Sequence, residues 1–203
     1  MINLSIRYTK KTREVLNFIS EYGFITTNIC SKVFYKGNKN GYSQSIVMLN
    51  KLYKNGDLKR YTHENTKEWI YQMQSKLVDD HRKSMVDLYS NIFTLADSIL
   101  YFKIEENWSI SKRRSDAHII FSKDGVTNSF LVEYEKYHTT SNNKLKEIFN
   151  SGEVQEFYSK RFGADSYFPN VLVISPLGTT RLVSNDVTIV CIAYDLKGLY
   201  DLI

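Results

Sequence analysis

The sequence predicts an α+β chain in two parts: an N-terminal winged helix-turn-helix at residues 1–76 and a small mixed-sheet α/β domain at residues 77–203. Three short amphipathic segments followed by two alternating strands give the element order of a winged helix. Apolar strands around a helical stretch then indicate a sheet with helices packed against it. Charge divides in the same way, since residues 1–76 carry 13 Lys and Arg against 5 Asp and Glu, and residues 77–203 carry 14 against 17.

The composition is that of a globular protein with ample core material, at 42% hydrophobic and 24% charged residues. No apolar run approaches the length of a membrane span, so no membrane partner is expected. The first residues contain no apolar segment typical of a secretory signal, and we expect a cytoplasmic location. Cys30 and Cys191 lie far apart in apolar segments, without zinc-ligand spacing, and are predicted to be buried and reduced.

Three helices are predicted in the first part. The first runs from an N-cap at Thr9 to a stop at Gly23. The second is capped by Thr26 or Thr27. The third follows the loop at residues 36–41 and ends at Asn55-Gly56. The apolar residues expected on their buried faces are Val15, Leu16, Phe18 and Ile19, then Ile29, Cys30, Val33 and Phe34, then Ile46, Met48, Leu49 and Leu52.

After the third helix, residues 57–73 alternate like two strands around a polar tip at residues 63–67. In a winged helix the third helix enters the major groove, and its first residues face base edges. Together with the net charge of +8, this order favours double-stranded DNA as the partner. A protein-interaction module is the alternative. The candidate DNA-binding residues are Lys39, Asn40, Tyr42, Ser43 and Gln44, with Ser45 beside them, and Lys59, Arg60 and Lys67 on the wing; His63 is expected to be an exposed loop residue.

A linking helix is predicted at residues 77–100, where apolar residues recur at three- and four-residue steps. His81 follows two aspartates, but three adjacent helical residues point in different directions, so no metal site is expected there. A strand at residues 100–104 and a loop at residues 105–108 follow.

A hairpin with its turn at Lys123-Asp124-Gly125 comes next, because Asp-Gly is a strong hairpin signal. The helical stretch at residues 139–162 is expected to break near Ser151-Gly152, and apolar strands at residues 170–176 and 187–195 follow it. The last strand either forms an edge that pairs with a second copy, giving a homodimer, or lies inside its own sheet.

The hairpin carries three acids. Asp116 opens its first strand, and Glu133 and Glu135 stand two residues apart in the second, so they share a face. Carboxylates in such a pattern hold Mg²⁺ in nucleases, where the metal lowers the pKa of the attacking water. Asp116, Glu133 and Glu135 are therefore the candidate metal ligands.

The order of segments resembles the replication-relaxation family of plasmid and integrative-element proteins. The stretches that carry the resemblance are "SDAHIIF", "FLVEYEKY", "NKLKEIF" and "NVLVISP". The residues at the family's motif positions are Arg114, Asp116, Ala117, Glu133, Glu135, Lys144 and Leu145, with Ser115 in place of a common proline. The resemblance implies a second domain like a PD-(D/E)xK nuclease core. It also implies a DNA-associated role in replication or conjugative transfer, with a replication initiator or relaxase as a partner.

A nuclease of that fold needs a lysine two residues beyond its strand glutamate, and here Glu135 stands there. Lys136 falls on the opposite face of the strand, which leaves Lys144 or Lys146 as candidates from the next helix. We therefore expect a non-catalytic scaffold without a cofactor. The alternatives are a Mg²⁺-dependent nuclease using Asp116, Glu133, Glu135 and Lys144, and a transcriptional regulator.

Overall fold

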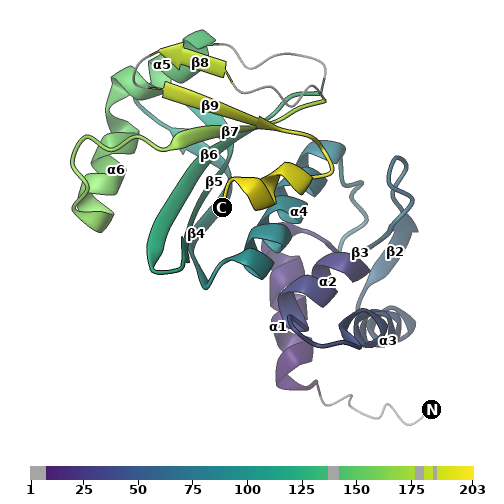
Figure 1. The fold of residues 1–203 in the computed structure, drawn as a ribbon. Coiled ribbons are helices and arrows are strands. Elements are labelled where there is room, and N and C mark those ends of the chain that lie inside the picture. Colours follow the sequence, from purple (N-terminus) through teal and green to yellow (C-terminus); the bar gives the residue numbers. More distant parts are fainter. Residues whose placement is uncertain (1–7, 137–141, 177–180, 185–186) are drawn as a thin grey trace. The chain divides into compact units, whose positions relative to one another are not determined.

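The computed structural model describes residues 8–136, 142–176 and 187–203, and the backbone of residues 181–184 (Figure 1). The chain combines helices with a three-stranded and a six-stranded sheet, which confirms the predicted α+β class. It divides into two compact units between Ser90 and Asn91. The division falls inside a helix rather than at residue 76, because that helix contributes buried residues to the first unit.

The first unit contains the three predicted helices and the predicted hairpin in order. They are α1 (Lys10–Tyr22), β1 (Ile25–Thr26), α2 (Thr27–Phe34), α3 (Gly41–Lys54), β2 (Lys59–Thr62) and β3 (Trp69–Gln72). The sheet has the order β1-β3-β2, and both pairs are antiparallel. The two-residue β1 thus closes the hairpin into a three-stranded sheet, a pairing that the sequence analysis did not predict.

Threonine side chains cap the starts of α1 and α2, and a glycine ends α1, as the sequence predicts. Thr9 accepts a hydrogen bond from the backbone N–H of Thr12, and Thr26, not Thr27, caps α2 by accepting from Ile29. Gly23 ends α1 in the left-handed conformation at φ 91°, which costs glycine no steric strain. These predictions depend on neighbours in the sequence, and they are confirmed.

The core of the first unit differs from the prediction at α3. Its buried residues are Gly41, Ser45, Leu49 and Leu52, whereas Ile46 is 38% exposed. Ile46 follows Ser45 by one residue and so lies about 100° away around the helix. In α2, Val33 and Phe34 are only half-buried. Cys30 is buried, and burial raises the pKa of its thiol to about 11, but Cys191 is only half-buried.

The predicted linking helix is shorter than residues 77–100. Helix α4 spans Asp80–Leu95. Asp79, the residue before it, accepts a hydrogen bond at Oδ1 from the backbone N–H of Arg82 in the first turn. Leu77 is 81% exposed, outside the helix. Residues from Ser98 onward join a strand instead, since the backbone N–H of Asp97 donates to the carbonyl of Ser122 and draws the chain into the sheet.

The second unit is a mixed sheet with helices packed against it. Its elements are β4 (Ser98–Trp108), β5 (Arg113–Lys123), β6 (Val126–Tyr134), α5 (Asn142–Ser151), α6 (Glu153–Phe162), β7 (Asn170–Ile174), β8 (Arg181–Ser184), β9 (Val187–Ile192) and the short 3₁₀ helix η1 (Lys197–Asp201). The strand order is β4-β5-β6-β7-β9-β8. Strands β4, β5 and β6 form an antiparallel meander, β6, β7 and β9 run parallel, and β8 pairs antiparallel with β9.

One prediction about these strands is wrong. Residues 105–108 are strand, not loop: β4 continues through Glu105, which has a φ of 57°, and pairing resumes with Glu106 opposite Ser115. Strand β9 lies between β7 and β8, which confirms the second of the two alternatives for the last strand, a position inside its own sheet. Strand β8, which pairs with β9 on its outer side, was not predicted from the sequence. The turn at Asp124-Gly125 and the helix break at Gly152 are confirmed.

The core that positions the candidate site lies between the sheet and α5 and α6. It joins Ile120, Leu131 and Val173 from the strands to Leu145, Ile148, Val154 and Tyr158 from the helices. Figure 1 shows α5 and α6 on this side of the sheet. Residues 116, 118 and 120 alternate onto this face, as do 131, 133 and 135, so the acids of the hairpin lie on the helix-covered side.

Candidate nucleic-acid interface

Helix α3 presents one face to the core and the opposite face to solvent. Ser43, Val47 and Lys54 are exposed and follow a spacing of four and seven residues, which places them in one outward stripe. Tyr42 and Gln44 are also exposed, as predicted. Ser45 is buried instead, and its hydroxyl donates to the carbonyl of Gly41 at 2.8 Å, so it cannot face a ligand.

The turn before α3 is ordered by Asn38. Its Oδ1 accepts from the backbone N–H of Asn40 at 2.8 Å, and its Nδ2 donates to Gln44 Oε1 at 3.2 Å. The side chain of Gln44 is thereby oriented, with its amide NH₂ as a remaining donor group. A Cβ on Gly41 would come within 2.9 Å of the Tyr35 Cβ, so only glycine lets α3 start this close to α2. Lys39, in this turn, is exposed.

Arg60 connects the hairpin to α3. Its guanidinium lies 4.3 Å from the ring centroid of Tyr53 and 4.6 Å from that of Trp69, and Nη1 donates to Asn50 Oδ1 at 2.9 Å. This half-buried arginine therefore braces the β2–β3 hairpin against the helix rather than projecting as an outward cation. Lys59 is exposed and donates to Ser75 Oγ at 2.8 Å, while Lys67 is exposed at the hairpin tip.

His63 is buried, not exposed as predicted, with only 3% of its surface accessible. Its Nδ1 is bonded by the backbone N–H and the hydroxyl of Thr66, and its Nε2 lies 3.6 Å from Asp80 Oδ1. Asp80 also accepts from the side chain of Asn65. These contacts fasten the hairpin tip to the start of α4, a long-range packing effect that local sequence does not reveal.

A buried lysine makes a second contact between the same hairpin and α4. Lys83 Nζ lies 2.6 Å from Glu68 on the hairpin and 2.6 Å from Asp87 on its own helix. Burial alone would lower the pKa of Lys83, but the two carboxylates raise it above its ordinary value. The ammonium therefore stays charged and ties the hairpin to α4.

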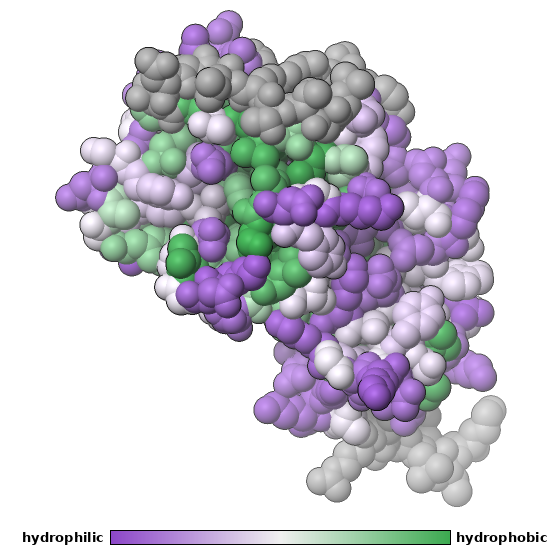
Figure 2. All heavy atoms as spheres, in the orientation of Figure 1, coloured by the Kyte–Doolittle hydropathy of each residue, from purple (hydrophilic) through white to green (hydrophobic). Residues whose placement is uncertain are grey.

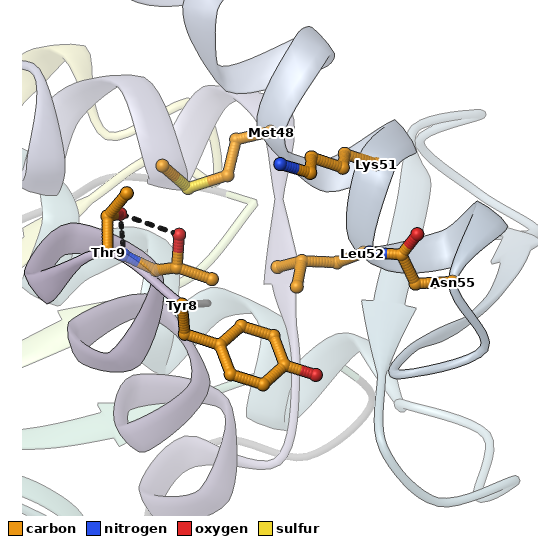
Figure 3. A pocket seen from close by; sticks show the side chains of 7 residues that line it. Tyr8, Thr9, Met48, Lys51, Leu52 and Asn55 are labelled. Carbon is orange, nitrogen blue, oxygen red and sulfur yellow. Dashed lines mark hydrogen bonds between the residues drawn. The ribbon is translucent and has the colours of Figure 1, made fainter. Parts of the chain in front are cut away.

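A small cavity lies between the start of α1 and α3 (Figure 3). Figure 3 shows Tyr8 and Thr9 on one side and Met48, Lys51, Leu52 and Asn55 on the other. Its volume is about 30 Å³, far below the several hundred Å³ of typical ligand sites. The Tyr8 hydroxyl donates to Asp57 Oδ1 at 2.5 Å beside it. This gap is therefore a packing defect between helices, too small for an organic ligand.

The structure brings together three of the four candidate residues in the second unit. The β5–β6 ladder ends at Ala117 and Val132. Just beyond it, Asp116 Oδ2 accepts from the backbone N–H of Tyr134 at 2.7 Å. Glu133 is 2% exposed, and Lys144 Nζ of α5 donates to its Oε2 at 2.6 Å. A buried carboxylate thus has a counter-ion from the next helix.

The fourth candidate, Glu135, is buried, and hydrogen bonds hold its backbone on both sides. Its N–H donates to the carbonyl of Ile174, and its carbonyl accepts from the hydroxyl of Tyr194. Arg113 and Arg114 are directed elsewhere, to Glu147 and Glu105. Among the residues that the structure describes, no group of three or more His, Cys, Asp or Glu side chains is placed to hold a metal ion.

A buried polar cluster around His118, which was not predicted from the sequence, lies in the same sheet as these acids. His118 is fully buried, with its Nε2 2.8 Å from the Tyr158 hydroxyl and its Nδ1 3.8 Å from Glu106 Oε2. Burial alone would raise the pKa of Glu106, but interactions with the side chains of His118, Lys103 and Tyr101 lower this pKa to about 2. Glu106 could not be predicted as part of the cluster because residues 105–108 were expected to form a loop. The position of His118 could have been predicted, since it alternates with Ile120 in the same strand and so faces the same side of the sheet.

Comparison of the chain with models of known protein families, with curated proteins and with solved structures gave no match. Within the described ranges, no helix is long and apolar enough to cross a membrane.

Proposed function

We propose that the chain is a DNA-binding accessory protein for replication or conjugative transfer of a plasmid or integrative element, whose first unit binds origin DNA. The observation that carries the proposal is the outward stripe of α3, held beside a braced basic hairpin. The order α1-β1-α2-α3-β2-β3, with β1 closing the sheet, supports a winged helix-turn-helix assignment for this unit. Helix α3 would then enter the major groove.

The charge of this unit supports a polyanionic partner. Exposed lysines lie before α3, on it and on the hairpin: Lys39, Lys51, Lys54, Lys59 and Lys67. Each phosphate that a lysine neutralises releases counter-ions, so the affinity for duplex DNA should fall steeply with salt. Fluorescence anisotropy across a series of salt concentrations measures this slope. Binding that is insensitive to salt, or absent, contradicts the proposal.

Charge-neutral variants locate the phosphate contacts. Replacing Lys39, Lys59 and Lys67 by Gln should weaken binding to all duplexes and reduce the salt slope by roughly 0.9 per lysine. The matched control replaces three exposed lysines of the second unit, Lys112, Lys146 and Lys197, and should leave the slope unchanged. If both triple variants weaken DNA binding equally, the lysines attract DNA through net charge alone and the first unit has no defined DNA interface.

Gln44 is proposed to read a base edge. Gln44→Ala should reduce discrimination between a duplex selected from random sequence and an unrelated one by roughly 1–3 kcal/mol, because the amide can bond a base in two places. Asn38→Ala, which removes the contact that orients Gln44, should act in the same direction. Gln74→Ala, at an exposed glutamine outside α3, is the control. Equal losses of affinity for both duplexes would mean that Gln44 contacts only the sugar-phosphate backbone of the DNA.

For the second unit we propose a nuclease-like core that has been kept as a scaffold for binding itself or a replication initiator or relaxase. The antiparallel meander β4-β5-β6, the helical crossover and the parallel β7 support the resemblance to a PD-(D/E)xK core. Two features support loss of cleavage: Glu135 stands at the lysine position, and Lys144 neutralises Glu133. Light scattering of the purified chain, alone and on its selected duplex, tests self-association, and a strictly monomeric state in both would remove the homodimer.

One geometry favours cleavage as a second candidate function. Asp116 and Glu133 flank the point where β5 and β6 separate, and Lys144 lies within hydrogen-bond distance of Glu133. Incubation of supercoiled plasmid and single-stranded DNA with Mg²⁺ tests it. Nicking that is lost in Asp116→Asn would establish the enzyme, whereas intact substrates in all reactions would exclude it for these DNAs.

A further inference from the structure

The outward stripe of α3 and the exposed residues beside it include apolar side chains, at positions where a surface helix normally carries polar ones. Val47 is 69% exposed, Tyr42 57% and Ile46 38%. Val47 lies one turn beyond Ser43, directly opposite the buried residues Gly41, Ser45 and Leu49. It therefore contributes nothing to the core of the unit, and valine is also a poorer helix former than the polar alternatives Lys, Gln or Glu.

Charge around this apolar stripe indicates the kind of molecule that covers it. Residues 41–54 contain no acid, and Lys51 and Lys54 are exposed on the same helix. On the face seen in Figure 2, the first unit is mainly hydrophilic, with a small hydrophobic area beside α3. A narrow aliphatic stripe between lysines fits a surface that is apolar in the middle and anionic at its margins.

The major groove of A·T-rich DNA is such a surface. The C5 methyl of thymine is the apolar group that base edges present in that groove, and phosphates line both of its sides. We infer that α3 reads thymine methyl groups, with Val47 as the principal contact and Ile46 beside it. This inference rests on the proposed DNA-binding function and names the base that the helix selects.

The expected size of the effect follows from the area of one methyl group. Burying a single methyl from water changes an affinity by about fourfold. Replacing thymine by deoxyuracil removes the methyl and leaves the hydrogen-bonding groups of the base unchanged. A site in which Val47 and Ile46 together cover two methyls should therefore lose more than tenfold in affinity on full replacement.

The experiment compares two duplexes, an A·T-rich one and the same duplex with every thymine replaced by deoxyuracil. Affinities are measured for the full chain, for Val47→Ala and for Val126→Ala, whose valine is 60% exposed in the second unit. Alanine is the better helix former, so Val47→Ala does not threaten folding. We expect the unaltered chain and Val126→Ala to prefer thymine at least fourfold, and Val47→Ala to lose most of that preference.

The other outcomes separate the inference from the function beneath it. Equal binding of the two duplexes by the unaltered chain overturns thymine reading and leaves DNA binding in place. An unchanged preference in Val47→Ala overturns the role of Val47. No binding to either duplex overturns the proposed function itself. If Val47→Ala leaves DNA affinity unchanged but dissociates a dimer detected by sedimentation, the stripe contacts a second copy of the chain and the inference is wrong.

Discussion

Asp116 Oδ2 accepts a hydrogen bond from the backbone N–H of Tyr134 at the point where β5 and β6 separate. The ladder ends at the pair Ala117–Val132, so the side chain of Asp116 supplies an acceptor that backbone pairing no longer provides to Tyr134. Backbone groups left without an acceptor at a strand end are costly when buried. At the scale of one residue, this acid therefore has a structural task that needs no metal ion.

The first prediction separates that task from metal binding. Asp116→Ala should lower the free energy of unfolding by about 1.5–3 kcal/mol, because the bond to an ionised acceptor is lost. Asp116→Asn should cost less, since its amide oxygen can still accept from Tyr134. Urea denaturation of the three chains measures both values. Stabilisation by either variant would indicate that Asp116 serves a ligand at the expense of stability.

Among the DNA-binding candidates, Arg60 has a structural role that its residue type did not predict. Its residue type and position predicted a phosphate contact, but its guanidinium stacks on Tyr53 and Trp69 and bonds Asn50. Residue type was sufficient to identify Lys39, Lys59 and Lys67 as exposed cations. It could not distinguish an arginine that faces solvent from one that braces two elements, because its partners lie seven to ten residues away on other elements.

Among the elements, the β5–β6 hairpin shows how strongly a turn sets register. Asp124 and Gly125 have φ values of 51° and 77°, and Lys123 pairs directly with Val126. This is a two-residue turn with both central residues left-handed, the geometry that matches strand twist. The alternation of the hairpin then places Asp116 and His118 on the face covered by α5 and α6.

The second prediction tests the turn. A Cβ on Gly125 would meet nothing within 4 Å, so the cost of Gly125→Ala is confined to backbone strain. We expect it to lower the free energy of unfolding by about 1–2 kcal/mol, the penalty of the left-handed conformation. Asp124→Asn, which keeps a residue that tolerates this conformation, should be neutral in the same thermal or urea unfolding experiment. A neutral Gly125→Ala would mean that the turn readjusts.

At the scale of the whole molecule, the buried cluster around His118 makes the free energy of unfolding depend on pH. Burial lowers the pKa of His118 below 6.5, and the pKa of Glu106 lies near 2 in the folded chain. For both groups the folded pKa is below the unfolded one. The unfolded chain therefore takes up the proton first, and stability is lost as pH falls below 6.5 for His118 and from 4.5 towards 2 for Glu106.

The third prediction follows from that sign. Lowering the pH from 7.5 to 5.5 should decrease the free energy of unfolding of the unaltered chain, and His118→Gln should reduce this decrease. Urea titrations at the two pH values measure it. NMR provides an independent check, because the His118 ring signal should titrate below pH 6.5 in the folded chain. A midpoint at or above 6.5 would contradict the assignment.

The sequence by itself determined the features that depend on near neighbours: the caps at Thr9 and Gly23, the turn at Asp124-Gly125, the break at Gly152 and the α+β class. Only the tertiary structure decided that His63 is buried, that β9 lies inside the sheet, that β4 replaces the end of the linking helix and that Lys144 pairs with Glu133. The physical reason is range. A cap or a tight turn is stabilised by groups a few residues apart, whereas burial, strand order and ion pairs depend on segments that meet only when the whole chain has folded.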